Sequence, residues 1–211
     1  MTMIFYDFKM APSPRRARII LAEKNIPHQT VQIDMMKNEQ MSDAYRAINP
    51  NCTVPALKLD DGTILTDNAG ITAWVEANYP EPPLTGTTPL AKAEIASWQA
   101  KIEAEFAMGV AHALRNANPA MKGRALPGPY DYEQIPALAE RGLNQTDHFM
   151  ESLESHLDGK EFIAADQFSL ADITAAVTLD FARVVKRKPD DRHANIKRWR
   201  ASLDERPSFA L

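Results

Sequence analysis

The sequence predicts an α/β domain over residues 1–80, a linker over residues 81–88 and an all-helical domain over residues 89–211. Two observations support this fold class. Short strand-like and helix-like patterns alternate in the first part of the chain in the order β-α-β-α-β-β-α, whereas the apolar spacing after the linker is helical throughout. The two parts are separated by the stretch PEPPLTGTTP, whose prolines and glycine are typical of a connection between domains.

Length and composition argue against several classes of protein. The chain has 211 residues, of which 45% are hydrophobic and 25% charged, so it can bury a sizeable core and is not disordered as a whole. A formal net charge of −4 argues against a nucleic-acid-binding protein, which needs a basic surface. The single cysteine, Cys52, excludes an intrachain disulfide and a CxxC redox pair. Because neither an export signal nor a membrane span is recognised, we expect a cytoplasmic protein without nucleic-acid or membrane partners.

The first half of the α/β domain is predicted from its strand-like runs and its prolines. Strands are expected at residues 4–6 and 30–33, and a short helix near residues 42–47. Ser13 stands where an N-cap would precede Pro14 at the first helical position, which predicts a helix from there to about Asn25. Because the two strands flank this helix, they should lie parallel in one sheet.

The second half of the α/β domain carries a hairpin signal. In PALKLDDGTILT, two alternating runs are joined by Asp61 and Gly62, which predicts an antiparallel β-hairpin. Asp67 then stands at the N-cap of a helix that is expected to run to Tyr79. Together these elements predict a small mixed sheet with helices on its faces.

The helical domain is predicted from apolar spacing and one capping signature. Long helices are expected over residues 88–118 and 133–157. In the segment FSLADI, Ser169 can cap the backbone amide of Asp172, and the carboxylate of Asp172 can accept from the amide of Ser169. This capping box predicts the start of a further helix and has a structural role.

Two blocks of the sequence resemble those of a known family. NPNCTVPALKLDDGTILTDNAGI and FSLADI stand in this order on either side of the proline-rich linker, and they resemble the corresponding blocks of the cytosolic glutathione transferase superfamily. The resemblance implies a thioredoxin-like fold for the α/β domain and a helical bundle for the other. It also implies glutathione as co-substrate, conjugation of its thiol to a small hydrophobic electrophile, and a two-fold homodimer.

By the same resemblance, the backbone of glutathione would bind around Val54 and Pro55. The bond between these residues is expected to be cis, and Val54 to offer its amide and carbonyl to the cysteinyl residue of the tripeptide. Gln40 and Thr53 align with positions that contact the glycyl end, where family members often have His or Lys. Without the resemblance, Gln40 and Thr53 would be interpreted as ordinary polar loop residues.

The γ-glutamyl end of glutathione is expected at the start of the helix that Asp67 precedes. A helix N-terminus presents unpaired amides and a partial positive charge, which suits a carboxylate. The family has Glu or Gln followed by Ser at this place, whereas this chain has Asp67 and Asn68. We expect Asp67 to bind the ammonium group and the amide of Asn68 to donate to the carboxylate. The alternative is that Asp67 is only an N-cap.

Catalysis requires a group that stabilises the glutathione thiolate, because a free cysteine thiol has a pKa of about 8.5 and is mostly protonated at pH 7. Ser13 is the expected hydrogen-bond donor, assisted by the dipole of the first helix. The resemblance places Ala11 where some members have their activating serine, and Ser13 where others have a cysteine or an asparagine. Three alternatives stay open: backbone amides near Met10 and Ala11, the hydroxyl of Tyr6, and a Ser13 that only caps the helix.

The electrophile is expected to bind between the domains, against the apolar side chains of Met10, Trp98, Phe106 and Met108. The five histidines show no metal-binding spacing, so no metal is expected. The predicted activity is therefore glutathione transfer. Two other functions stay open on the same scaffold: a glutathione-dependent disulfide reductase or peroxidase, and a non-catalytic binding protein.

Overall fold

The computed structural model describes residues 2–211, which form two compact units. The first unit contains the chain up to Pro82 together with the short loop Pro127–Tyr130. The second unit contains Pro83–Leu126 and Asp131–Leu211. Among the helices of residues 2–211, none combines the length and the apolar character that a membrane span requires.

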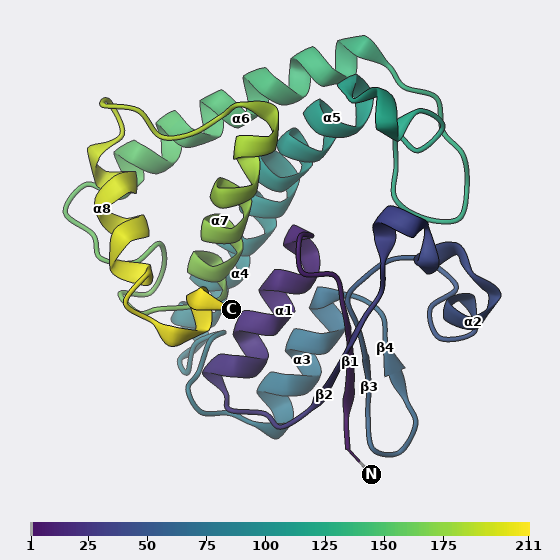
Figure 1. Ribbon diagram of the computed structural model, residues 1–211. Coiled ribbons are helices and arrows are strands. Elements are labelled where there is room, and N and C mark those ends of the chain that lie inside the picture. The colour runs from purple at the N-terminus through teal and green to yellow at the C-terminus, as the bar shows by residue number, and fades with distance from the viewer. Residues whose placement is uncertain (1) are drawn as a thin grey trace. The chain divides into compact units, whose positions relative to one another are not determined.

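The first unit is built around a four-stranded sheet with the strand order β2-β1-β3-β4. Its elements are β1 (Ile4–Asp7), α1 (Pro12–Glu23), β2 (Gln29–Gln32), η1 (Met35–Lys37), η2 (Glu39–Met41), α2 (Asp43–Arg46), β3 (Ala56–Lys58), β4 (Ile64–Leu65) and α3 (Asn68–Asn78). Strands β1 and β2 are parallel, and β3 runs antiparallel to both β1 and β4. Helices α1 and α3 pack together on one side of the sheet, and α2 lies on the other side (Figure 1). The predicted element order, the parallel pair and the hairpin are confirmed.

The hairpin between β3 and β4 turns where the sequence predicts it. Gly62 has a φ angle of +91°, which only glycine adopts without strain. The amide of Leu59 donates to the carbonyl of Thr63 at 2.8 Å, and the amide of Thr63 donates to Oδ1 of Asp61 at 2.8 Å. The turn is therefore fixed by both backbone and side-chain hydrogen bonds.

Helix α1 begins at Pro12, two residues before the start predicted at Pro14. Its N-cap is Ala11, whose extended backbone (φ −86°, ψ 140°) is the conformation favoured before a proline. Ser13 therefore lies inside the first turn, and its expected N-cap role is wrong. Both Pro12 and Pro14 fit in this turn because the first amides of a helix have no intrahelical partner to lose.

A buried lysine joins the end of α1 to the end of α3. The side chain of Lys24 is completely buried, and its Nζ atom lies 2.6 Å from Oε1 of Glu76. The same nitrogen donates to the carbonyl oxygens of Tyr79, at 2.6 Å, and of Pro82, at 2.7 Å. An ammonium group has three N–H donors, and these three acceptors match them. Lys24 thus fixes the last residues of the first unit.

The named elements of the second unit are all helices. They are α4 (Pro89–Lys101), the π-helical η3 (Ile102–Ala107), α5 (Met108–Ala117), η4 (Pro119–Met121), α6 (Pro136–His156), α7 (Leu170–Phe181), η5 (Ala182–Val185), α8 (Ala194–Leu203) and η6 (Pro207–Ala210). The long helix predicted over residues 88–118 is present, but a π-helical segment interrupts it. The helical unit and the thioredoxin-like unit together confirm the predicted fold class.

The capping box at the start of α7 is confirmed and has further partners. Oδ2 of Asp172 accepts from the amide and the hydroxyl of Ser169, both at 3.0 Å. Its Oδ1 atom accepts from the amide of Ile163 at 3.0 Å and from Nε1 of Trp199 at 2.9 Å. One buried carboxylate therefore binds four donors from α7, α8 and the loop before α7.

Helices α5 and α6 approach each other closely at Gly142. A Cβ atom at this residue would lie 2.5 Å from the carbonyl oxygen of Gly109 and 2.7 Å from the amide nitrogen of Ala113. These backbone atoms cannot give way unless the helices separate. We therefore expect Gly142→Ala to lower the free energy of unfolding by about 1–3 kcal/mol, measured by urea denaturation followed by circular dichroism.

Gly70→Ala is the matched control for this prediction. It makes the same change inside a helix, but the new Cβ atom would meet Oδ1 of Asp67 at an ordinary contact distance of 3.5 Å. A helical Gly→Ala change without a clash is expected to be neutral or to stabilise by up to about 1 kcal/mol. Equal destabilisation by the two variants would contradict the close helix approach as the cause.

Candidate active site

The first turn of α1 has an unusual set of hydrogen-bond donors. Pro12 and Pro14 carry no N–H group, and the N–H group of Ala11 donates to the carbonyl of Phe8 at 3.0 Å. The remaining amide donor of this turn is that of Ser13. A helix N-terminus carries a partial positive charge, so this amide and the Ser13 hydroxyl are placed to stabilise an anion.

The structure brings Ser13 and Asn68 together. Nδ2 of Asn68 donates to Oγ of Ser13 at 2.8 Å and to the carbonyl oxygen of Ser13 at 3.1 Å. Because Oγ of Ser13 accepts from Asn68, the hydroxyl hydrogen is free to point toward a ligand. Both residues are half-buried. Two residues from separate parts of the expected site therefore form one unit.

This contact changes what Asn68 can do for a ligand. From the sequence, its side-chain amide is predicted to donate to a carboxylate, whereas both N–H groups of that amide face Ser13. Its Oδ1 atom is buried and has no partner within residues 2–211. Asp67 is the N-cap of α3, since its Oδ1 atom accepts from the amide of Gly70 at 2.7 Å. The capping role of Asp67 is confirmed, and its side chain remains exposed.

The segment before β3 is held by buried hydrogen bonds. The bond between Val54 and Pro55 is cis, as expected. The carbonyl oxygen of Thr53 accepts from the hydroxyl of Tyr45 and from Nδ2 of Asn49, both at 2.8 Å. Burial raises the pKa of the Tyr45 hydroxyl, which therefore stays protonated as a donor. Within the described residues, the backbone N–H and C=O groups of Val54 have no hydrogen-bond partner and can pair with an extended peptide.

Gln40 is a buried amide without partners. Its side chain lies in η2 and is completely buried, and neither Oε1 nor Nε2 has a hydrogen-bond partner within residues 2–211. An unpaired buried amide lowers stability by about 1–3 kcal/mol, so native proteins nearly always provide such groups with a partner. Gln40 therefore carries hydrogen-bonding capacity that the protein alone does not use.

Tyr6, one of the alternatives for thiol activation, lies in the core of the first unit. It packs with Ile33, Val54 and Ala56, and its ring meets that of Tyr45 edge-on with 5.9 Å between the centroids. Of the two backbone amides considered as alternatives, that of Ala11 is already bonded within the loop. Among the groups considered, the hydroxyl and amide of the half-buried Ser13 and the amide of Met10 therefore remain as donors.

The four residues expected to contact the electrophile have different environments. Met10 and Met108 are exposed, at 64% and 44% of their surface. Phe106 is completely buried and stacks on Phe149 with 4.7 Å between the ring centroids, so it belongs to the core of the second unit. Trp98 is half-buried and lines a cavity within the second unit.

Two features of the site were not foreseen from the sequence. The contact between Ser13 and Asn68 joins residues that are 55 positions apart, and no local pattern indicates it. The loss of amide donors from the first turn of α1 could have been read from the spacing of Pro12 and Pro14. Within residues 2–211, the structure shows no group of three or more His, Cys, Asp or Glu residues suited to a metal ion.

Comparison with known families and curated proteins gives consistent results. Residues 11–78 match the family described as glutathione S-transferase, N-terminal domain, and residues 136–202 match glutathione S-transferase, C-terminal domain. The chain is 35% identical to glutathione S-transferase 2 of Saccharomyces cerevisiae, over 98% of this chain and 87% of the relative. It is also 31% identical to maleylacetoacetate isomerase of Pseudomonas aeruginosa, over 55% of this chain and 53% of that protein.

Solved structures show the same similarity over the whole chain. Gtt2 from Saccharomyces cerevisiae superposes with a TM-score of 0.88 at 32% identity, and 98% of each chain is covered. A glutathione S-transferase domain-containing protein from Marinobacter aquaeolei gives a TM-score of 0.87 at 33% identity, covering 98% of this chain and 99% of the other. The similarity therefore extends across both units.

Proposed function

This chain belongs to the glutathione S-transferase family, and on that premise we propose that it conjugates the thiol of glutathione to a small hydrophobic electrophile, with Ser13 stabilising the thiolate. The observation that carries the proposal is the hydrogen bond of 2.8 Å from Asn68 to Oγ of Ser13 at the start of α1. It leaves the Ser13 hydroxyl hydrogen available at a helix N-terminus, where an anion is favoured.

The reaction requires the pKa of the glutathione thiol to be lowered modestly. A hydrogen bond to a charged group contributes about 1.5–3 kcal/mol, which corresponds to a pKa lower by roughly one to two units. Such a shift makes a large fraction of the bound thiol ionised at pH 7. The sulfur then forms a bond to the electrophilic carbon while the leaving group departs with its electron pair, or the electrons of a conjugated double bond move to the acceptor.

The remaining residues are assigned to binding of the tripeptide. Val54, followed by cis Pro55, would pair its free amide and carbonyl with the cysteinyl residue. The side chains of Gln40 and Thr53 would bind the glycyl end of glutathione. Its carboxylate would accept a hydrogen bond from the buried Nε2 of Gln40, which has no acceptor within residues 2–211. Asp67 would meet the ammonium group through the oxygen that does not cap α3. The γ-glutamyl carboxylate would bind the backbone amides of the first turn of α3, because the side-chain amide of Asn68 already donates its hydrogen bonds to Ser13.

Ser13→Ala tests the catalytic assignment. The variant removes the hydroxyl donor but keeps the backbone amide, so we expect the pKa of bound glutathione to rise by about one unit and turnover near pH 7 to fall by about tenfold, with little change in glutathione affinity. The measurement is a titration of thiolate absorbance in the binary complex, together with calorimetric titration of glutathione. An unchanged thiolate titration would rule out Ser13 as the activating group.

Two further variants sharpen this test. Ser42→Ala removes the serine that caps α2, whose Oγ atom accepts from the amide of Tyr45 at 3.2 Å, and it should leave the thiol pKa unchanged. Pro12→Ala adds an N–H donor to the first turn of α1, so the thiol pKa should fall below that of the wild type. Opposite shifts in Ser13→Ala and Pro12→Ala are the expected signature.

Substrate assays separate the conjugation activity from the other two functions. We expect faster turnover of an aryl halide than of 2-hydroxyethyl disulfide, and the reverse order would favour a glutathione-dependent reductase. No measurable glutathione binding would overturn the enzymatic proposal and favour a binding protein. We also propose the two-fold homodimer typical of the family, which light scattering of the purified protein tests directly.

A further inference from the structure

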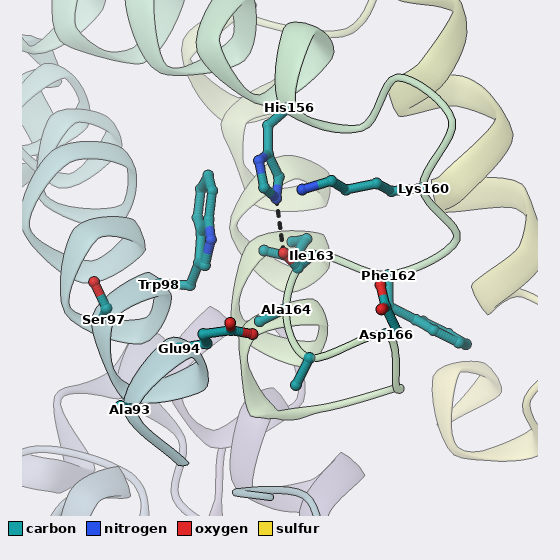
Figure 2. A pocket seen from close by; sticks show the side chains of 11 residues that line it. Ala93, Glu94, Ser97, Trp98, His156, Lys160, Phe162, Ile163, Ala164 and Asp166 are labelled. Carbon is teal, nitrogen blue, oxygen red and sulfur yellow. Dashed lines mark hydrogen bonds between the residues drawn. The ribbon is translucent and has the colours of Figure 1, made fainter. Parts of the chain in front are cut away.

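The second unit contains a cavity of about 680 Å³ that the proposed reaction does not use. Its walls are one face of α4, the end of α6 and the loop between α6 and α7 (Figure 2). The volume lies within the range of small-molecule binding sites. Every lining residue belongs to this unit, so the cavity exists independently of the glutathione site.

The cavity gathers charged side chains that the protein leaves without partners. Glu94 lies on α4, Lys160 follows the end of α6, and Asp166 lies on the loop. Within residues 2–211, none of these three side chains makes a hydrogen bond or an ion pair. Three elements therefore bring uncompensated charges of both signs to one cavity.

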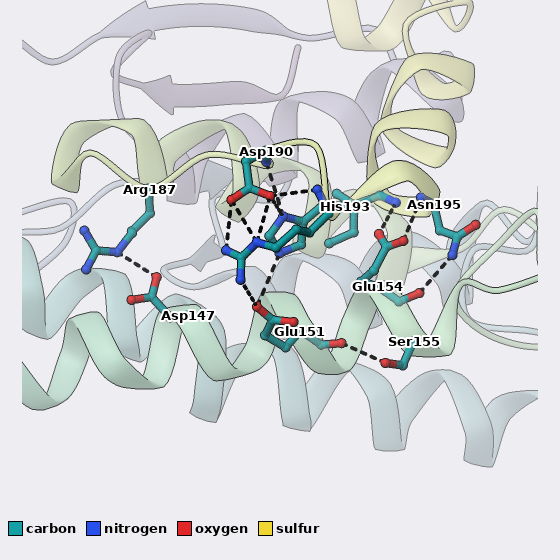
Figure 3. A network of polar contacts seen from close by, with 10 residues as sticks. Asp147, Glu151, Glu154, Ser155, Arg187, Asp190, His193 and Asn195 are labelled. Carbon is teal, nitrogen blue, oxygen red and sulfur yellow. Dashed lines mark hydrogen bonds and ion pairs between the residues drawn. The ribbon is translucent and has the colours of Figure 1, made fainter.

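Three carboxylates on α6 have partners within the same unit. In the network of Figure 3, Asp147 on α6 accepts from Nε of Arg187 at 2.6 Å. Glu151 lies 3.2 Å from Nη1 of Arg192, and Glu154 accepts from the amide of Asn195 at 2.9 Å. These three carboxylates of α6 are therefore used within the unit, whereas Glu94, Lys160 and Asp166 remain available to a ligand at the cavity.

One wall of the cavity is aromatic and carries a hydrogen-bond acceptor. Nε2 of His156 lies 2.7 Å from the carbonyl oxygen of Ile163, so that nitrogen carries the proton and Nδ1 of the neutral ring is an acceptor. Burial lowers the pKa of His156, which favours the neutral ring. The imidazole lies against Trp98, with 4.1 Å between the ring centroids.

The loop between α6 and α7, which completes the cavity, is held by side chains of α7 and α8. The amide of Ile163 donates to Oδ1 of Asp172 at 3.0 Å. Arg198 donates to the carbonyl oxygens of Lys160, at 2.9 Å, and of Leu157, at 2.7 Å. A wall held by a buried carboxylate and a guanidinium group is preorganised, so a ligand would not have to order it.

The charges lie at different ends of the cavity. Figure 2 shows Lys160 beside His156 at the end of α6, whereas Glu94 projects from α4 and lies away from this pair. We propose that this cavity binds a zwitterionic ligand with an aromatic or other apolar side chain, namely a short peptide with free ends. Its carboxylate would face Lys160, its ammonium group would face Glu94, and its side chain would lie against Trp98 and Phe162.

Three forms of one dipeptide test the proposal with the full-length protein. Phenylalanyl-phenylalanine carries both charges, its C-terminal amide lacks the carboxylate, and its N-acetyl form lacks the ammonium group. We expect calorimetric titration to show the tightest binding for the unmodified dipeptide and a loss of about three- to fivefold for each blocked form, the effect of one partly exposed ion pair. Equal affinity for the three forms, or no binding of any, would overturn the proposal.

Two charge variants test whether the carboxylate of the dipeptide binds Lys160 and its ammonium group binds Glu94. Lys160→Met should weaken binding of the unmodified dipeptide but not of its amide, and Glu94→Gln should weaken the unmodified dipeptide but not the N-acetyl form. Lys186→Met, which removes an exposed lysine that does not line this cavity, is the matched control and should change nothing. If Lys160→Met and Glu94→Gln bind all three forms like the wild type, the assignment is wrong.

Saturation with glutathione separates this site from the catalytic one. We expect the affinity for the dipeptide to be the same with and without saturating glutathione, and to be the same in Ser13→Ala. Competition by glutathione would place the dipeptide in the glutathione site and overturn the proposal. A failure of the transferase assignment would leave the dipeptide titration unaffected, so the two proposals are tested separately.

Discussion

Lys24→Met is expected to lower the free energy of unfolding by about 3–5 kcal/mol, the loss measured when one partner of a buried ion pair is removed. Methionine fills a similar volume but provides none of the three donors. Glu76, whose side chain is 14% exposed, would lose its ion pair with Lys24, and the carbonyl groups of Tyr79 and Pro82 would lose their donor. Urea denaturation followed by circular dichroism gives the free-energy difference.

Lys37→Met is the control for this prediction. Lys37 also forms an ion pair, with Asp34 at 3.2 Å, but its side chain is 84% exposed. Exposed pairs contribute about 0–1 kcal/mol, so this variant should unfold nearly like the wild type. Similar small losses in both variants would show that the buried lysine does not hold the first unit together.

Asp172→Asn is expected to destabilise the protein by about 3 kcal/mol. The carboxylate accepts four hydrogen bonds, from Ser169, Ile163 and Trp199. An amide of the same shape has one acceptor oxygen, and its NH₂ group would face donors. Asp204→Asn, at an exposed carboxylate paired with Arg200 on the surface, is the control and should lose less than 1 kcal/mol.

The stability difference between the wild type and Asp172→Asn is also expected to depend on pH. Burial raises the pKa of Asp172 from 3.8 to about 6, so between these values the folded protein binds a proton more tightly than the unfolded chain. The stabilisation that comes from this pKa difference is therefore fully present below pH 3.8 and is lost as the pH rises to about 6, above which the hydrogen bonds to the ionised carboxylate remain. The difference in unfolding free energy between wild type and Asp172→Asn should shrink over this range and then stay constant. A difference that grows with pH would contradict the assignment.

Features with a local signal in the sequence were predictable. Asp61 and Gly62 identified the hairpin, because few dipeptides allow such a tight turn. Ser169 and Asp172 identified the start of α7, because both partners of the capping box stand within one turn. The parallel pair of strands followed from the helix between them. In each case the residues that determine the structure are neighbours in the chain.

Features that depend on distant residues were not predictable in this way. Lys24 meets its three acceptors more than 50 positions further along the chain, and Ser13 meets Asn68 at a similar separation. The start of α1 was predicted at Pro14, whereas the helix begins at Pro12. Both prolines are compatible with a first turn, and which of them begins the helix depends on the path of the chain from β1. Only the folded structure brings these groups together.

The loop Pro127–Tyr130 affects how this protein can be recombined with its relatives. The loop is encoded within the helical half of the chain, yet it belongs to the first compact unit, where Asn51 is its neighbour at Gly128. A chimaera made with a single crossover after Pro82 would therefore join each sheet unit to a loop from a different parent. A chimaera that preserves both units needs three crossover points, one at the linker and one on each side of this loop.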